Sequence, residues 1–138
     1  FIKSLGLYRN KAKNLVLAAK KLIDEFGAQV PKEREMLESI PGVGSKTAAV
    51  IISNAFNIPA IAVDTHVARI ARRLGLTQQK NPDKVERELS IIFPRNRLLE
   101  AHHALIFHGR RICFARKPAC SNCPVEKLCP KIGVVESQ

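Results

Sequence analysis

The stretch Ile40-Pro41-Gly42-Val43-Gly44-Ser45-Lys46-Thr47 separates two segments of helical composition. Proline and glycine are costly inside a helix, so the first helix must end before them. Gly42 and Gly44 allow positive φ angles and a tight turn, and the Ser45 hydroxyl can cap a new helix. The stretch therefore predicts a helix, a glycine hairpin (residues 40–44) and a second helix. The first N–H groups of that second helix are unpaired donors suited to a phosphate oxygen.

Lys46 falls in the first turn of the second predicted helix. The helix dipole disfavours positive charge at this end, so lysine is more usual at the other end. The same dipole favours the neutral amine, which is the form that a nucleophile requires. The alternative interpretation is a surface lysine that contacts a DNA phosphate or solvent.

Charge is the most informative feature of the composition. The 138 residues carry a formal net charge of +11, and 46% of them are hydrophobic and 25% charged. This composition is globular and suits one domain or two small lobes. The positive charge favours a polyanionic partner, with nucleic acid preferred to a membrane surface. No apolar run is long enough to span a bilayer. Because the chain opens with Phe1 inside helix-forming sequence, we expect preceding residues in the native polypeptide.

Hydrophobic periodicity predicts helices throughout and no sheet, so the fold class is all-α. One helix is expected to end at Gly27, another to begin at Asn81-Pro82, and the short helix before the hairpin to bury Met36, Leu37 and Ile40. The helix after the hairpin is apolar nearly all round and is expected to be the most buried. The predicted helices cover residues 10–26, 33–40, 46–56, 65–74, 82–93 and 97–111.

The four cysteines, Cys113, Cys120, Cys123 and Cys129, fall within 17 residues. With no other cysteine to pair with, such a group indicates a metal site rather than disulfides. Four thiolates suit tetrahedral zinc or an iron–sulfur cubane. The long intervals on either side of the Cys120–Cys123 pair favour a body larger than one ion, but spacing alone leaves zinc open.

Basic residues surround the cysteines, among them Arg116 and Lys117 in the loop between the first two. A metal would hold this loop rigid against a phosphate backbone. The alternative is that these charges balance a thiolate-rich site.

Asp64, in the segment Ile61-Ala62-Val63-Asp64-Thr65-His66-Val67, is expected to cap the next helix. A functional role would require it to face Lys46 across a cleft. His102 lies on an apolar helix face and is expected to be a hydrogen-bonded core residue. No nucleophile and acid are placed to form a triad with any histidine.

Together, the hairpin with its lysine, the segment with Asp64, and the cysteine array preceded by His102-His103 and His108-Gly109-Arg110 resemble the helix–hairpin–helix DNA glycosylases that carry an iron–sulfur cluster, most closely the endonuclease III-like branch. The likeness runs over essentially the whole chain. It implies a helix–hairpin–helix lobe, residues 1–58, that is an incomplete six-helix barrel. It also implies a helical lobe, residues 59–138, with the cluster loop at residues 112–130.

The resemblance also implies roles for individual residues. Lys46 matches the Schiff-base lysine of the family and Asp64 its essential aspartate. The four cysteines match the ligands of a structural [4Fe-4S] cluster, and no nucleotide cofactor is expected. The residues expected to bind DNA are Pro41, Gly42, Val43, Gly44, Ser45, Thr47, Arg116 and Lys117.

The implied activity is that of a bifunctional DNA glycosylase and AP lyase of base excision repair. It would excise oxidised pyrimidines from double-stranded DNA and cleave 3′ to the abasic site by β-elimination. We expect a monomer without membrane association, in the cytoplasm or nucleoid of a prokaryote, or in the nucleus or mitochondrion of a eukaryote. The alternatives are a DNA-binding module with a structural metal and no reaction, and a monofunctional glycosylase.

Overall fold

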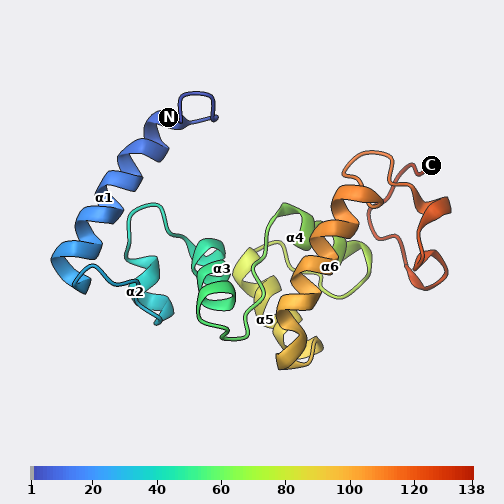
Figure 1. Ribbon diagram of the computed structural model, residues 1–138. Helices are drawn as coiled ribbons and strands as arrows, with labels where there is room; N and C mark the ends of the chain where they lie inside the picture. Colours follow the sequence, from blue (N-terminus) through green and yellow to red (C-terminus); the bar gives the residue numbers. More distant parts are fainter. Residues whose placement is uncertain (1) are drawn as a thin grey trace. The chain divides into compact units, whose positions relative to one another are not determined.

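The computed structural model describes residues 2–138, and the chain divides into two compact units, Phe1–Phe56 and Asn57–Gln138 (Figure 1). Helices, turns and irregular segments make up residues 2–138, and no strand occurs among them. The predicted all-α fold class is therefore confirmed. The predicted lobe boundary between residues 58 and 59 stays a prediction.

The first unit contains α1 (Tyr8–Phe26), α2 (Arg34–Glu38) and α3 (Ser45–Ala55). Gly27 ends α1 in the left-handed conformation with φ 58°, and its N–H donates to the Leu22 carbonyl, as the sequence predicts. No residue of α1 is buried, so its apolar face stays at least partly exposed within this unit.

Two burial predictions for the first unit are wrong. Leu37 and Ile40 are buried, but Met36 is 46% exposed, because a helix of five residues presents only one narrow face to its neighbour. Helix α3 buries four of its 11 residues, whereas α4 in the second unit buries four of nine. Helix α3 is therefore not the most buried helix.

The second unit contains α4 (Thr65–Arg73), α5 (Pro82–Ile92) and α6 (Leu98–Arg111). The Asn81 side chain caps α5 by accepting from the N–H groups of Asp83 and Lys84, with Pro82 at the first helical position, as predicted. Short 3₁₀ helices complete the unit: η1 (Arg95–Arg97), η2 (Cys120–Asn122) and η3 (Glu126–Leu128).

The core of the second unit forms where α4 packs against α5 and, more extensively, against α6. Val67, Ile70 and Leu89 are among its fully buried members. His102 is buried on α6, and its Nδ1 lies 2.9 Å from the Ala62 carbonyl oxygen, which confirms the predicted core histidine. Within residues 2–138 no helix is both long and apolar enough to cross a membrane.

Candidate functional site

The glycine hairpin closes through a backbone hydrogen bond from the Val43 N–H to the Ile40 carbonyl at 3.0 Å. Helix α3 then begins with a bond from the Ala48 N–H to the Gly44 carbonyl at 2.9 Å. Gly42 has φ +85°, and a Cβ added there would lie 2.9 Å from the Asn14 Cβ, so both backbone and space require glycine. Gly44 has φ −98°, so the expectation of positive φ is correct only for Gly42.

The N-cap of α3 is Gly44, not Ser45 as the sequence predicts. Ser45 is the first helical residue, and its hydroxyl accepts a hydrogen bond from Arg34 at 2.7 Å instead of capping the helix. The first amides of α3 precede the point at which helical hydrogen bonds begin, so they are the donors that a helix start leaves for other acceptors. A phosphate oxygen suits them, because the helix dipole is positive at this end.

Lys46 is the second residue of α3 and is exposed, as is Thr47 beside it. The hairpin residues are also accessible: Gly42 and Gly44 are exposed, and Pro41 and Val43 are half-buried. The predicted phosphate-binding residues of this unit therefore lie on its surface, consecutive along the chain with Lys46.

Asp64 is the N-cap of α4, as predicted. Its Oδ1 accepts a hydrogen bond from the Val67 N–H at 2.8 Å, and the residue is half-buried. Lys46 belongs to the first compact unit and Asp64 to the second. The convergence of the amine and the carboxylate on one sugar stays a prediction.

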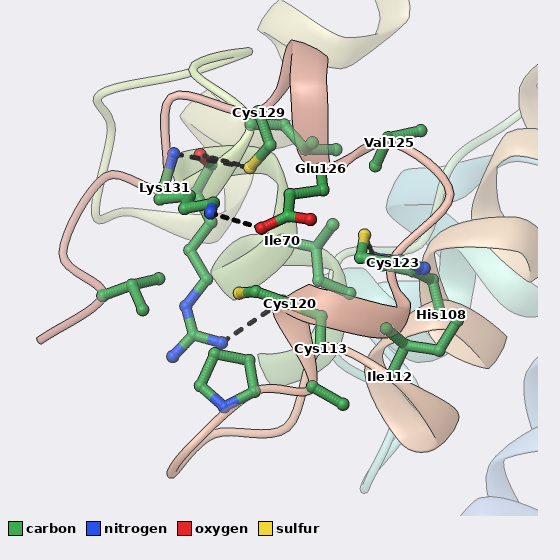
Figure 2. Close-up of a pocket in the computed structure, with 15 residues that line it drawn as sticks. Ile70, His108, Ile112, Cys113, Cys120, Cys123, Val125, Glu126, Cys129 and Lys131 are labelled. Carbon is green, nitrogen blue, oxygen red and sulfur yellow. Dashed lines mark hydrogen bonds and ion pairs between the residues drawn. The ribbon is translucent and has the colours of Figure 1, made fainter. Parts of the chain in front are cut away.

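The four cysteines, all half-buried, line one pocket of the second unit (Figure 2). Ile70, His108 and Val125 supply other parts of its wall, so the thiol groups face a largely apolar space. Thiolates are ligands for zinc and for iron–sulfur clusters. Within residues 2–138, however, no three His, Cys, Asp or Glu side chains come close enough together to hold one metal ion.

Arg73, the last residue of α4, fixes both ends of the cysteine loop, residues 113–129. Its Nη1 donates to the Phe114 carbonyl at 2.6 Å and to the Cys113 Sγ at 3.2 Å, and its Nη2 donates to the Ala115 carbonyl at 2.9 Å. At the other end of the loop, the Cys129 Sγ lies 3.4 Å from the Arg73 carbonyl oxygen. Arg73 is only 8% exposed, and these acceptors satisfy its buried guanidinium.

Arg69 lies one helical turn before Arg73 and binds the same segment. Its Nη2 donates to the Cys113 carbonyl at 2.9 Å and to the Gly109 carbonyl at 3.0 Å. Burial, and secondly the neighbouring charge of Arg73, lower the pKa of Arg69, while Cys113 and Asp64 oppose this effect. Burial also lowers the pKa of His108, whose Nε2 lies 3.7 Å from the Cys123 Sγ.

The loop between Cys113 and Cys120 is closed by a hydrogen bond from the Ala119 N–H to the Ile112 carbonyl at 2.9 Å. Arg116 and Lys117 are exposed on it, which suits the predicted contact with a phosphate backbone. Lys117 also forms an exposed ion pair with Glu136 at 3.2 Å. This acidic partner lies 19 residues further along the chain and is not predicted by the sequence pattern.

The sequence does not predict the roles of three arginines at the site, Arg34, Arg69 and Arg73. The spacing of Arg69 and Arg73 from Asp64 is visible in the sequence. The backbone carbonyls that Arg69 and Arg73 bind lie 40 to 44 residues away and carry no sequence signal of their own.

Comparison with known proteins agrees with these features. Residues 1–95 match the family described as HhH-GPD superfamily base excision DNA repair protein, and residues 113–129 match the iron–sulfur binding domain of endonuclease III. The second match supports a structural [4Fe-4S] cluster, as predicted, and its range begins at Cys113 and ends at Cys129; the role of the four cysteines as its ligands stays a prediction. The residues fit it, because all four thiols line one pocket and thiolates are the ligands that such clusters take.

Individual relatives carry the name endonuclease III. That of Treponema pallidum (strain Nichols) is 45% identical over 97% of this chain and 64% of its own length. That of Bacillus subtilis (strain 168) is 49% identical over 93% of this chain and 59% of its own. A structure described as a trapped endonuclease III–DNA covalent intermediate in an estranged-adenine complex matches with a TM-score of 0.90 at 46% identity, covering 94% of this chain and 62% of that one.

A more distant structure, a thermostable thymine-DNA glycosylase, matches with a TM-score of 0.84 at 28% identity, covering 94% of this chain and 62% of that one. The chain thus spans about three-fifths of the length of the relatives it resembles. The expected resemblance to endonuclease III-like glycosylases is confirmed. With a family match over residues 1–95 of 138, the chain belongs to the HhH-GPD superfamily of base excision DNA repair proteins.

Proposed function

We propose that this protein is a bifunctional DNA glycosylase and AP lyase that acts on double-stranded DNA containing a damaged base or an abasic site. Oxidised pyrimidines are the proposed substrates. The observation that carries the proposal is the exposed Lys46 in the first turn of α3, directly after the glycine hairpin. A relative 46% identical to this chain is described as a covalent intermediate with DNA, which is consistent with a nucleophilic side chain.

The protein binds DNA through the phosphate groups of the backbone. The amides at the start of α3 donate to phosphate oxygens, and the exposed Arg116 and Lys117 contribute charge from the second unit. Such contacts do not read sequence, which suits an enzyme that must find damage anywhere. The damaged nucleotide is rotated out of the stack, and weakened pairing lowers the free energy of that step.

Lys46 then performs the nucleophilic step. The lone pair of its Nζ attacks the sugar C1′, a C–N bond forms, and the C1′–base bond breaks with the base leaving. The sugar ring opens to give a Schiff base with Lys46. The imine acidifies the C2′ hydrogen, so loss of that proton expels the 3′ phosphate. Water hydrolyses the imine and restores the amine.

Asp64 supports the same step through its charge. Its carboxylate stabilises the positive charge that develops on the sugar and helps to remove a proton from the attacking amine. Because Oδ1 already accepts from the Val67 N–H, the carboxylate has a fixed orientation at the start of α4. Cys113, Cys120, Cys123 and Cys129 would hold the cluster, which would supply a structural crosslink of the loop and no bond-breaking chemistry. The protein acts as a monomer.

The test is borohydride trapping with native full-length protein, loaded with its cluster, on duplex DNA containing an oxidised pyrimidine. Wild-type protein and the Lys20→Gln variant, which changes an exposed lysine of α1, are expected to give a covalent adduct. The Lys46→Gln variant is expected to give none. Base release without an adduct or strand cleavage would assign a monofunctional glycosylase, and DNA binding without base release would assign a non-catalytic module.

A further inference from the structure

The side chain of Arg34 connects the two helices that flank the glycine hairpin. Its Nε donates to the Glu38 Oε1 at 2.8 Å, at the end of α2. Its Nη2 donates to the Ser45 Oγ at 2.7 Å and reaches the Ser45 carbonyl oxygen at 3.5 Å, at the start of α3. One planar guanidinium therefore holds both arms of the hairpin, with Glu38 fixing its orientation.

The residue that Arg34 binds immediately precedes Lys46. Ser45 is the first residue of α3, and the first turn of a helix frays readily when no side chain caps it. Gly44 has no side chain to provide a cap, and the bond from Arg34 to the Ser45 hydroxyl does not satisfy the amides of this turn. It does tie Ser45, the residue next to Lys46, to α2.

Helix α2 has only five residues and cannot be stable alone. Leu37 of α2 is fully buried and Ile40 just after it is 4% exposed, and this apolar packing explains why α2 associates with α3. Arg34 is different, because its side chain is 38% exposed and contributes little buried apolar surface. Its contribution is instead the direction that its hydrogen bonds to Glu38 and Ser45 impose on the start of α3.

We propose that Arg34 is a positioning residue for the amine of Lys46: it determines the rate of attack on the sugar and not the affinity for DNA. The inference rests on the proposed function of Lys46. A misplacement of about 1 Å can slow a reaction by about 100-fold when the reacting groups must be aligned. We expect the Arg34→Met variant to lose at least about 10-fold in single-turnover trapping rate at saturating DNA.

The experiment measures the borohydride trapping rate against DNA concentration for full-length, cluster-loaded protein. Four variants are compared with wild type: Arg34→Met, Arg34→Lys, Ser45→Ala and the double variant Arg34→Met/Ser45→Ala. Arg9→Met is the matched control, because Arg9 is an exposed arginine of the same unit whose guanidinium lies 5.8 Å from the Tyr8 ring. Melting temperature and circular dichroism are recorded for each.

If Arg34 positions Lys46, the Arg34→Met variant should have a lower maximal trapping rate and an unchanged half-saturating DNA concentration. The Arg34→Lys variant keeps the charge but not the two-armed geometry, so it should not restore the rate. The double variant should be no slower than Arg34→Met alone, because both changes remove the same hydrogen bond. The control should match wild type.

Three results would overturn the inference. One is an unchanged maximal rate in Arg34→Met. The second is a wild-type maximal rate in Arg34→Lys with only the half-saturating DNA concentration changed, which would assign Arg34 to phosphate binding. The third is a rate loss that follows the loss of folded protein, which would assign a merely structural role. An absence of adduct in wild type would instead refute the proposed function, so the two failures are distinguishable.

Discussion

At Gly109 on α6, the side chains of α4 lie so close that adding one methyl group tests the packing of the two helices. A Cβ built on Gly109 would lie 2.7 Å from the Ile70 Cδ1, 3.0 Å from the His66 Nδ1 and 3.1 Å from the Arg69 Nη2. The first distance is shorter than real Cβ contacts allow. We therefore expect the Gly109→Ala variant to be destabilised.

Two opposing effects determine the change in the free energy of unfolding of Gly109→Ala. Alanine in place of glycine within a helix stabilises by about 1 kcal/mol. Forcing a methyl group into a packed core costs about 1–3 kcal/mol, and the upper part of that range applies because Ile70 is 1% exposed and has no space to move into. The net loss is about 1–2 kcal/mol. At about 4 °C per kcal/mol, the melting temperature should fall by about 4–8 °C.

The assay is thermal unfolding followed by far-UV circular dichroism, with iron content measured on the same samples. Gly6→Ala is the control, because a Cβ there meets nothing within 4 Å, and its melting temperature should stay close to that of wild type. If Gly109→Ala melts at or above the wild-type temperature, the two helices are not in contact at this residue, and the packing described for the second unit is wrong.

Other perturbations test the remaining features. The Arg73→Met variant should release iron to a chelator roughly 10–100-fold faster than wild type, because groups that hold metal ligands contribute that much to affinity, whereas Arg72→Met on the same helix should not. The Asp64→Asn variant keeps a capping oxygen and should melt near the wild-type temperature but lose trapping activity; Asp64→Ala should also lose about 1 kcal/mol of stability by denaturant unfolding. Hydrogen bonds from Arg97 lower the pKa of Glu100 from 4.5, so any stability from this pair is present above the ordinary carboxyl pKa and disappears as pH falls through the lowered value. Carboxyl NMR titration should show this shift in wild type and its loss in Arg97→Gln.

The features that the sequence predicted well are local. Asn81-Pro82 and Asp64 cap the helices that follow them, and Gly27 ends α1, because each depends only on a side chain or a φ angle within a few residues. The fold class and the cysteine site follow from periodicity and residue type. These features can be predicted because they do not depend on contacts with distant segments of the chain.

The predictions that were wrong depend on contacts between segments. Serine is a common capping residue, but the Ser45 hydroxyl instead accepts a hydrogen bond from Arg34, which lies 11 residues earlier in the chain. Met36 has the spacing of a buried residue, yet the neighbouring surface covers only Leu37 and Ile40. A pattern along one segment shows which face is apolar and cannot show how much of it another segment covers.

The placement of Asp64 and Arg73 at opposite ends of α4 limits how this region can change in evolution. An α-helix turns by about 100° and advances by 1.5 Å with each residue. One inserted or deleted residue between the two would swing the arginine away from the cysteine loop while the aspartate kept its place. Relatives that keep the cluster should therefore tolerate substitutions within this helix but preserve its length.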